Sequence, residues 1–166
     1  MDAREPGARR WWHGSAVAIS EFRIMKGAGG IHFGTMDQAM ARRRSFLHEV
    51  ELKIEAPCRS RDNQDWCAAA RRARSRNMDA IVYLNRYEGL SLERILELQG
   101  AGKLSGLDGL PDAAFRKLVP EARDSVCVLR PDIIRLMRIL DRDGAVVWER
   151  QDPRRPEGQL QGDPEP

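Results

Sequence analysis

The sequence predicts an α+β fold in which strands outnumber helices. Runs rich in β-branched and aromatic residues occur at residues 46–54, 79–84 and 125–129, at uneven spacing along the chain. No internal repeat is visible, so a solenoid or propeller is not expected. Strands without the regular strand–helix alternation of a parallel sheet are typical of the α+β class.

The composition indicates one soluble domain. The 166 residues are 42% hydrophobic and 32% charged, which is enough for a two-layer core but short for two domains. No stretch approaches the roughly 20 apolar residues that cross a bilayer, and no apolar signal-peptide region is present. We therefore expect no membrane partner, and a cytoplasmic domain over residues 10–150 between disordered segments at 1–9 and 151–166.

The cysteines and histidines do not suggest a metal site. Three scattered cysteines, with no C-x-x-C pair, are typical of reduced thiols in a cytoplasm and argue against a zinc module. His13, His32 and His48 lack the helical or turn spacing of ligand pairs, so no metal is expected.

The first quarter of the chain predicts two short strands. The bulky run Arg10–His13 favours the first, and a Gly-rich turn at 26–30 leads into the second at 31–33. Residues 16–25 are mildly apolar, and their periodicity does not decide between a connecting helix and an extended loop.

A capped helix and a half-buried strand follow. Thr35, with Gln38 three residues later, has the capping-box pattern, and the apolar stripe behind it predicts a helix to about Arg44. Alternation of apolar and polar residues over 46–54 then indicates a half-buried strand that Pro57 ends.

The middle of the chain predicts a helix, an inner strand and a loop. Asp62 or Asn63 can cap a helix over about 64–76. The β-rich run 79–84 predicts an inner strand, which leads into a polar exit loop at 85–89.

Two short helices and a mobile link are expected next. Ser91 caps a helix through residue 98 that Gly100 closes, and Asp112 caps a helix over 113–118. Glycines make the intervening residues 100–112 mobile in this prediction.

The last part of the domain predicts a strand and a hairpin. Residues 125–129 form the strand, and 133–140 and 145–149 flank an Asp-Gly turn signal. A helix capped by Asp132 is the alternative for the first hairpin arm.

Two strand ends carry the candidate binding residues. The first strand ends in His13, Gly14 and Ser15, and the second runs from Gly30 through His32 to Gly-Thr. A glycine at a strand end lets a ligand approach the backbone closely. Two such ends, about twenty residues apart, can line one cleft.

Two arginine clusters, at 42–44 and 71–76, give an uneven charge distribution. They could meet the phosphates of a nucleic acid or a dinucleotide, or they could simply be solvated helix faces. No aromatic residues interleave with them, which weakens the interpretation as a nucleic-acid platform.

Three segments, in order, resemble the motifs of one enzyme family. Residues 11–15 resemble the His-Gly-Ser/Thr strand of ADP-ribosyltransferases of the diphtheria-toxin and poly(ADP-ribose) polymerase type. Gly30–Phe33 resembles the second motif, usually Gly-Ile-Tyr-Phe. Residues 124–131 resemble the third motif, a strand that begins near a catalytic Glu in active polymerases.

The likeness extends to the connecting strands. Residues 52–57 and 79–83 look like those of the small bacterial and prophage branch of the superfamily, and the whole resemblance covers residues 10–139. It implies split antiparallel sheets that form an NAD cleft, with short flanking helices, and a prophage or toxin-like setting.

The resemblance also implies roles for individual residues, with NAD as substrate. His13 would bond the nicotinamide ribose hydroxyls, the Gly14 backbone would bind the carboxamide, and Ser15 would support the adenosine side. His32 takes the place of a Tyr that stacks on nicotinamide. The remaining residues of the expected NAD-binding set are Gly30, Ile31 and Phe33.

The sequence departs from the family at the catalytic triad, because His-Tyr-Glu becomes His13, His32 and Ser125. Serine cannot stabilise a cation as a carboxylate does. Asp124 points to the opposite face of a regular strand, so it either pairs with an arginine or replaces the Glu through a bulge. Glu88, in the loop after another strand, is the other available carboxylate.

Three functional hypotheses follow. The first is a mono-ADP-ribosyltransferase that modifies a protein or a nucleic acid, in the cytoplasm or in a target cell. The second is an inactive module of the same fold that binds NAD, ADP-ribose or nucleic acid, which the missing Glu favours. The third is a nucleic-acid-binding protein that uses the two arginine clusters.

Overall fold

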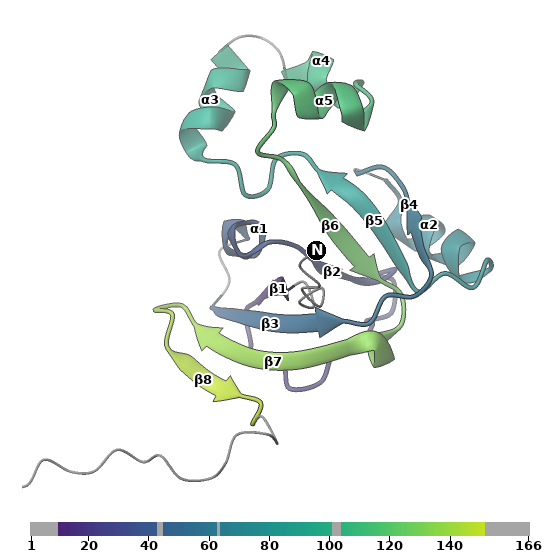
Figure 1. The fold of residues 1–166 in the computed structure, drawn as a ribbon, viewed down its shortest axis with the longest axis vertical. Helices are drawn as coiled ribbons and strands as arrows, with labels where there is room; N and C mark the ends of the chain where they lie inside the picture. Colours follow the sequence, from purple (N-terminus) through teal and green to yellow (C-terminus); the bar gives the residue numbers. More distant parts are fainter. Residues whose placement is uncertain (1–9, 43–44, 63, 101–103, 152–166) are drawn as a thin grey trace, which may run out of the picture.

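The computed structural model describes residues 10–42, 45–62, 64–100 and 104–151. Within these ranges, eight strands form two four-stranded sheets, and the α+β prediction is confirmed (Figure 1). The first sheet has the order β1 (Arg10–Ser15), β3 (Phe46–Leu52), β7 (Ile134–Asp141), β8 (Val146–Glu149). The second has the order β2 (Ile31–Phe33), β6 (Arg123–Val128), β5 (Ala80–Asn85), β4 (Pro57–Arg59). Neighbouring strands are antiparallel except β4 and β5.

The two sheets are joined at β1 and β2. Trp12 and Gly34 exchange a pair of backbone hydrogen bonds, with N–O distances of 2.8 and 2.9 Å. The main core lies between the sheets, and it contains buried apolar side chains from both: Trp11, Ile31, Phe33, Val50, Val126, Val128, Leu136 and Ile139. Each such side chain contributes roughly 1.5–3 kcal/mol when it is fully buried, so this core fixes how the two sheets sit against each other.

Helix α1 (Met36–Ala41) follows β2 directly, as the capping pattern predicts. The Thr35 hydroxyl accepts from the Gln38 N–H at 3.3 Å, and the Gln38 side chain accepts from the Thr35 N–H at 2.8 Å. The helix ends earlier than expected, with Arg42 as its C-cap, and residues 43–44 of the first arginine cluster lie outside the described residues.

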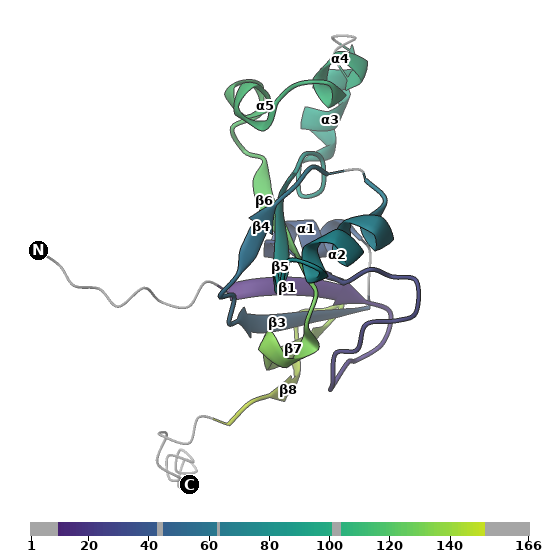
Figure 2. The same cartoon turned by 90° about the vertical axis from the view of Figure 1, so that its right-hand side faces the viewer.

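Helix α2 (Trp66–Arg74) covers one face of the second sheet (Figure 2). Its cap is Asp65, whose carboxylate accepts from the Ala68 N–H at 3.0 Å. The expected cap Asp62 accepts instead from the Arg86 N–H, at 3.4 Å, and the alternative Asn63 lies outside the described residues. Small side chains let the helix approach the sheet closely, at Ala69, Ala70 and Ala73.

A helical lobe, residues 92–118, is inserted between β5 and β6 (Figure 1). It comprises α3 (Leu92–Gly100), α4 (Leu104–Asp108) and α5 (Asp112–Leu118). The expected mobile link at 100–112 is therefore corrected in part, because α4 lies within it; residues 101–103 lie outside the described residues. Ser91 caps α3 as predicted, since its hydroxyl accepts from the Arg94 N–H at 3.1 Å.

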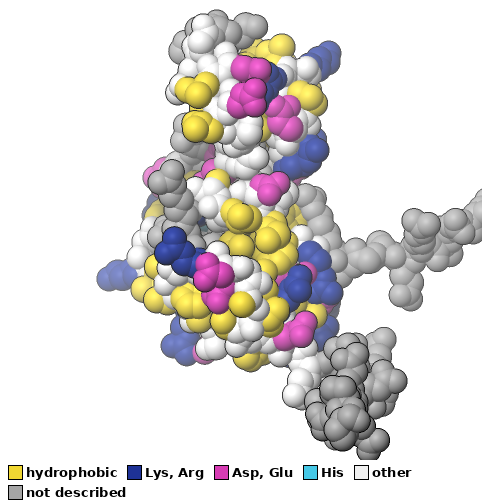
Figure 3. Space-filling view, turned by 90° about the vertical axis from the view of Figure 1, so that its left-hand side faces the viewer, with side chains coloured by type: hydrophobic (Ala, Val, Ile, Leu, Met, Phe, Trp, Pro, Cys, Tyr) yellow, Lys and Arg dark blue, Asp and Glu magenta, His cyan; other side chains and the backbone are white. Residues whose placement is uncertain are grey.

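The lobe has a small core of its own and is tied to the second sheet by Arg86. The Arg86 guanidinium donates to the carbonyls of Leu107 and Leu110, both at 2.5 Å, and lies 4.8 Å from the centre of the Phe115 ring. The lobe core also includes Leu84 of β5. Leucines of α3 and α5 stay exposed, and Figure 3 shows hydrophobic side chains on one face of both the lobe and the body below it.

The remaining elements differ from expectation in ways that packing explains. β3 is buried on both faces from Leu47 to Val50, because Leu47 packs with Ala39 of α1 and Val50 lies in the main core. Ion pairs with Arg10 and Arg138 compensate the buried Glu49. Pro57 begins the edge strand β4 rather than only ending its predecessor, since the first residue of an edge strand needs no N–H.

At the C-terminal end, the hairpin prediction is confirmed by β7 and β8. The helix alternative shrinks to one short 3₁₀ turn, Pro131–Ile133. Residues 16–25 form neither helix nor strand. The expected disordered ends, 1–9 and 152–166, lie outside the described residues. No helix in the described part of the chain is long and apolar enough to span a membrane.

Replacing Gly30 should destabilise the fold. A Cβ at Gly30 would lie 2.5 Å from Cys127 Sγ and 2.6 Å from the Val128 carbonyl oxygen, which the second sheet holds in place. Gly30→Ala should therefore lower the free energy of unfolding by about 1–3 kcal/mol in urea titrations. The control is Gly106→Ala in α4, where no atom lies within 4 Å; it should be neutral or raise stability by up to about 1 kcal/mol. Equal effects of the two variants would contradict this packing.

Candidate functional site

A cleft lies where the ends of β1, β2 and β6 meet α1. The space within it that a water-sized sphere can enter is about 10 Å³, which is roughly the room for one water molecule. A ligand therefore has to displace side chains of the rim or lie over the rim itself. The cleft is lined by Trp12, His13, Gly14, His32, Phe33, Gly34, Gln38, Ala39, Arg42, Tyr83, Glu88 and Ser125.

The His13 ring is fixed by the backbone of the neighbouring strand. Its Nδ1 lies 2.8 Å from the carbonyl oxygen of His32, and because a carbonyl only accepts, Nδ1 carries a proton. In the neutral ring Nε2 is then the acceptor nitrogen. Phe22 and Phe33 pack against the ring with centroids 5.5 and 5.4 Å away. The first candidate residue is therefore held in one tautomer and one orientation.

His48 supports this arrangement from inside the core. Its Nε2 accepts from the Ile19 N–H at 2.8 Å, so its Nδ1 donates to the His13 carbonyl at 3.2 Å. Burial lowers the pKa of His48 and keeps the ring neutral. The third histidine is thus a buried positioning residue that ties the segment after β1 to β3.

His32 lies in an aromatic pocket that the sequence did not reveal. Its Nδ1 is 2.9 Å from the Tyr83 hydroxyl, and the Trp66 ring meets it edge-on at a centroid distance of 4.5 Å. Burial lowers the pKa of His32 to about 4, with a further contribution from Arg42. The ring is therefore neutral near pH 7 and does not repel a positively charged pyridinium.

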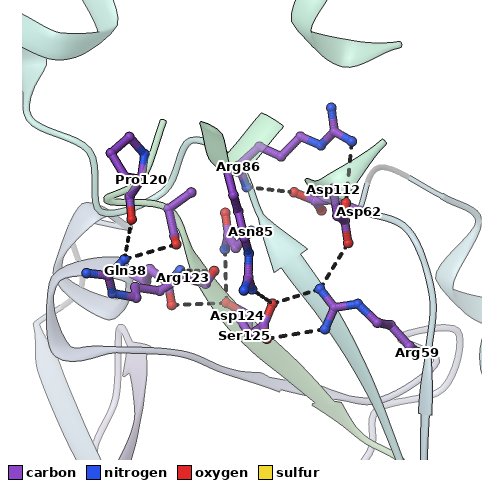
Figure 4. A network of polar contacts seen from close by, with 12 residues as sticks. Gln38, Arg59, Asp62, Asn85, Arg86, Asp112, Pro120, Arg123, Asp124 and Ser125 are labelled. Carbon is purple, nitrogen blue, oxygen red and sulfur yellow. Dashed lines mark hydrogen bonds and ion pairs between the residues drawn. The ribbon is translucent and has the colours of Figure 1, made fainter. Parts of the chain in front are cut away.

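Ser125 is a buried junction rather than an exposed nucleophile. It is 2% exposed, and its hydroxyl donates to Gln38 Oε1 and accepts from Asn85 Nδ2, both at 3.1 Å (Figure 4). Gln38 in turn donates to the Arg123 carbonyl at 3.0 Å. The Ser125 proton is committed, so the residue joins α1, β5 and β6 instead of reacting.

The carboxylate of the cleft comes from Glu88, which the sequence placed only in an exit loop. Asn85 Nδ2 donates to Glu88 Oε2 at 2.7 Å, and the Glu88 N–H returns a bond to Asn85 Oδ1 at 3.2 Å. Gly89 follows with φ +87°, a conformation that favours glycine, and packs on Gln38. This turn directs Glu88 back toward α1. Among the described residues, Glu88 is the acidic side chain that lines the cleft.

Arg42 closes the rim of the cleft by pairing with Glu88. Its Nε and Nη2 each lie 3.2 Å from one carboxylate oxygen. Because the two side chains are 35% and 37% exposed, the pair contributes only ~0–1 kcal/mol, and a bound ligand can displace it. Arg42 was predicted only as part of a basic cluster.

Asp124, the other acidic candidate, lies away from the cleft. Its carboxylate accepts from Arg59 and Arg116 (Figure 4). Burial alone would raise the pKa of Asp124, but these hydrogen bonds outweigh it and lower the pKa. β6 pairs with β5 in unbroken register, with no bulge that would turn Asp124 around. Of the two alternatives for Asp124, the structure shows the pairing with arginines and not a bulge that places the carboxylate in the cleft.

Three other expected NAD-binding residues do not line the cleft. Ile31 is buried in the core between the sheets, and Gly30 packs against β6. The Ser15 hydroxyl accepts from the Val17 N–H at 3.2 Å. Of the expected set, the structure brings together His13, Gly14, His32, Phe33 and Ser125.

The lining residues that sequence reasoning did not assign to the site are Tyr83 and Arg42, together with Trp66 behind His32. Glu88 was named as the other available carboxylate, but nothing in the sequence indicated that it lines the cleft. Within the described residues, no group of His, Cys, Asp or Glu side chains is placed to hold a metal ion.

One arginine of the second cluster, Arg74, has a structural role. Arg74 donates to the backbone carbonyls of Gly29 and Leu129, at 2.5 and 3.3 Å for its Nη2. It is therefore committed to holding α2 against the second sheet.

Comparisons add no relative: no protein-family model, curated protein or solved structure matches this chain. The functional assignment accordingly depends on the cleft and on the motif resemblance.

The burial of His32 should make stability depend on pH. The unfolded chain binds a proton near pH 6.5 that the folded chain takes up only near pH 4, so this contribution is present above pH 6.5 and is lost as pH falls toward 4. The stability difference between wild type and His32→Gln should change by up to about 3 kcal/mol over that window. Urea unfolding at pH 7.5, 5.5 and 4.5 measures it. Identical pH profiles for both proteins would show that His32 is not desolvated.

Proposed function

We propose that the protein is an NAD-dependent mono-ADP-ribosyltransferase that modifies a macromolecule. The three motif segments of the sequence lie on β1, β2 and β6, and their residues line one cleft. The two separate sheets, antiparallel except for the β4–β5 pair, are close to the split antiparallel sheets that the resemblance implies. Both facts support the proposal independently of any single motif.

The observation that carries the proposal is that Glu88 lines the same cleft as His13 and His32. The position of the family Glu is occupied by Ser125, but Ser125 is linked through Asn85 to the Glu88 carboxylate. A carboxylate therefore enters the cleft from the loop after β5. Its charge is available to stabilise the ribosyl cation that forms as nicotinamide leaves.

Each residue then has a defined role. His13, with its Nδ1 proton fixed, orients the nicotinamide ribose through Nε2. The neutral His32 ring offers a stacking surface for nicotinamide. The glycosidic C–N bond breaks with its electron pair going to nicotinamide, and an acceptor nucleophile bonds to the ribose carbon. Glu88 stabilises the cation and can accept the proton that the nucleophile loses.

Removing the Glu88 charge should abolish turnover, whereas removing that of Asp124 should not. Glu88→Gln keeps an oxygen that can accept from Asn85 but loses the charge and one of the two acceptors for Arg42, so we expect nicotinamide release and labelling of a cell lysate with labelled NAD to fall by about 100-fold or more. Asp124→Asn is the matched control outside the cleft, with circular dichroism to confirm that each variant folds. His13→Ala should also remove the signal.

The contradicting results are equally concrete. The proposal is refuted if the wild type, at high protein concentration, yields no labelled acceptor and releases no nicotinamide. Equal losses in Glu88→Gln and Asp124→Asn would remove Glu88 from the mechanism.

A binding module is the second candidate, because the Glu88 carboxylate is already paired with Arg42 and the cleft is small. Calorimetry separates the two functions. Binding of NAD without release of nicotinamide supports the module, and turnover excludes it.

A further inference from the structure

The Arg42–Glu88 pair has the geometry of a site that can exchange one anion for another. Arg42 presents two parallel N–H groups, Nε and Nη2, to the two oxygens of one carboxylate. A phosphate group offers the same pair of oxygens and more charge, and arginine binds both anions in this forked manner. A phosphate that enters the cleft therefore competes with Glu88 for the same donors.

Glu88 would keep its place when Arg42 is taken by another anion. Its second partner is Asn85, which is buried and is itself bonded to Ser125. The backbone N–H of Glu88 is also bonded to the Asn85 side chain, at 3.2 Å. Losing Arg42 thus leaves the carboxylate in the cleft with its negative charge no longer paired with arginine.

The size of the cleft puts a diphosphate at the rim. The cleft has room for about one water molecule, so a diphosphate has to lie outside it, against the most exposed lining residues. Arg42 is the only arginine or lysine among the described residues that line the cleft, and its side chain is 35% exposed. It is the cation available to a diphosphate there.

We infer that Arg42 is a phosphate-binding residue that exchanges the Glu88 carboxylate for the diphosphate of a bound nucleotide. Binding of the diphosphate thereby frees Glu88 to face the ribose, and the site favours nucleotides with a diphosphate over nucleosides without one. The inference depends on the proposed function for the identity of the nucleotide. It does not depend on turnover, because the exchange is a binding event.

Calorimetry with inorganic diphosphate, ADP-ribose and nicotinamide riboside tests the exchange. Arg42→Gln should weaken the binding of the first two by about 10-fold or more, and it should not weaken that of nicotinamide riboside, a cation that the unpaired Glu88 charge does not repel. Glu88→Gln should tighten the binding of inorganic diphosphate and ADP-ribose by roughly 3- to 10-fold, because the competing charge is gone. Arg130→Gln, which removes an exposed arginine paired with Asp132, is the matched control and should change nothing.

The sign of the Glu88→Gln effect decides between exchange and simple structural support. If Glu88 only stabilises Arg42, this variant weakens diphosphate binding or leaves it unchanged, and the inference is overturned. Equal losses for diphosphate and nicotinamide riboside in Arg42→Gln would overturn it as well, as would a wild type that binds neither inorganic diphosphate nor ADP-ribose. If a short single-stranded oligonucleotide binds more tightly than ADP-ribose and its binding depends on Arg42, the ligand is a nucleic acid and the inference of a nucleotide is overturned.

Failure of the inference can be told from failure of the proposed function. Arg42-dependent diphosphate binding in a protein that never releases nicotinamide leaves the exchange standing and refutes the enzyme. If the protein releases nicotinamide, and Arg42→Gln changes neither this release nor the affinity for ADP-ribose, the enzyme stands and the exchange is refuted.

Discussion

The backbone bridge between Trp12 and Gly34 is the constraint on which the rest of the site depends. It joins two sheets that share no strand, and it lies within β1 and directly after the end of β2. The His13 ring spans the same junction with its bond to the His32 carbonyl. Gly34 has no side chain, and a Cβ there would lie 2.3 Å from Gln38 Oε1. The absence of a side chain thus lets α1 approach the sheet junction closely enough to complete the cleft.

Behind this junction lies a neutral polar network of Gln38, Ser125 and Asn85. The two amide side chains each use both of their polar atoms, and the Ser125 hydroxyl both donates and accepts. Leaving one of them unpaired would cost about 1–3 kcal/mol, so the network holds its members in one arrangement. Its outer end is the Glu88 carboxylate, and the charge therefore lies where solvent and ligand can reach it.

The features that the sequence predicted are those that local chemistry determines. The Thr35 capping box depends on two residues three positions apart, and the Asp-Gly turn between β7 and β8 depends on its own dipeptide. Pro57 was assigned only to the end of a strand, and Asp62 or Asn63 was predicted as the cap that Asp65 provides, because the position of an edge strand, or of a cap among neighbouring polar residues, depends on what packs against it. The helix α4 was missed because glycines suggested mobility where Leu107 is buried.

The same distinction between local and long-range determinants applies to the residues of the site. His13, Gly14 and His32 could be found because each belongs to a contiguous motif. Tyr83 and Arg42 could not, because separate segments have to fold before they meet. Glu88 could be named as an available carboxylate, but its place in the cleft depends on the left-handed turn at Gly89 and on the contact with Arg42.

The helical lobe gives the cleft a mechanical connection to a distant surface. Arg86 and Tyr87 are tied to the lobe, through the Leu107 carbonyl and the Asp108 carboxylate respectively, whereas the next residue, Glu88, is tied to α1. Adjacent peptide units are thus anchored to two different bodies, with only a few backbone torsions between them. The short segment that carries the cleft carboxylate is therefore the same one that holds the lobe in place.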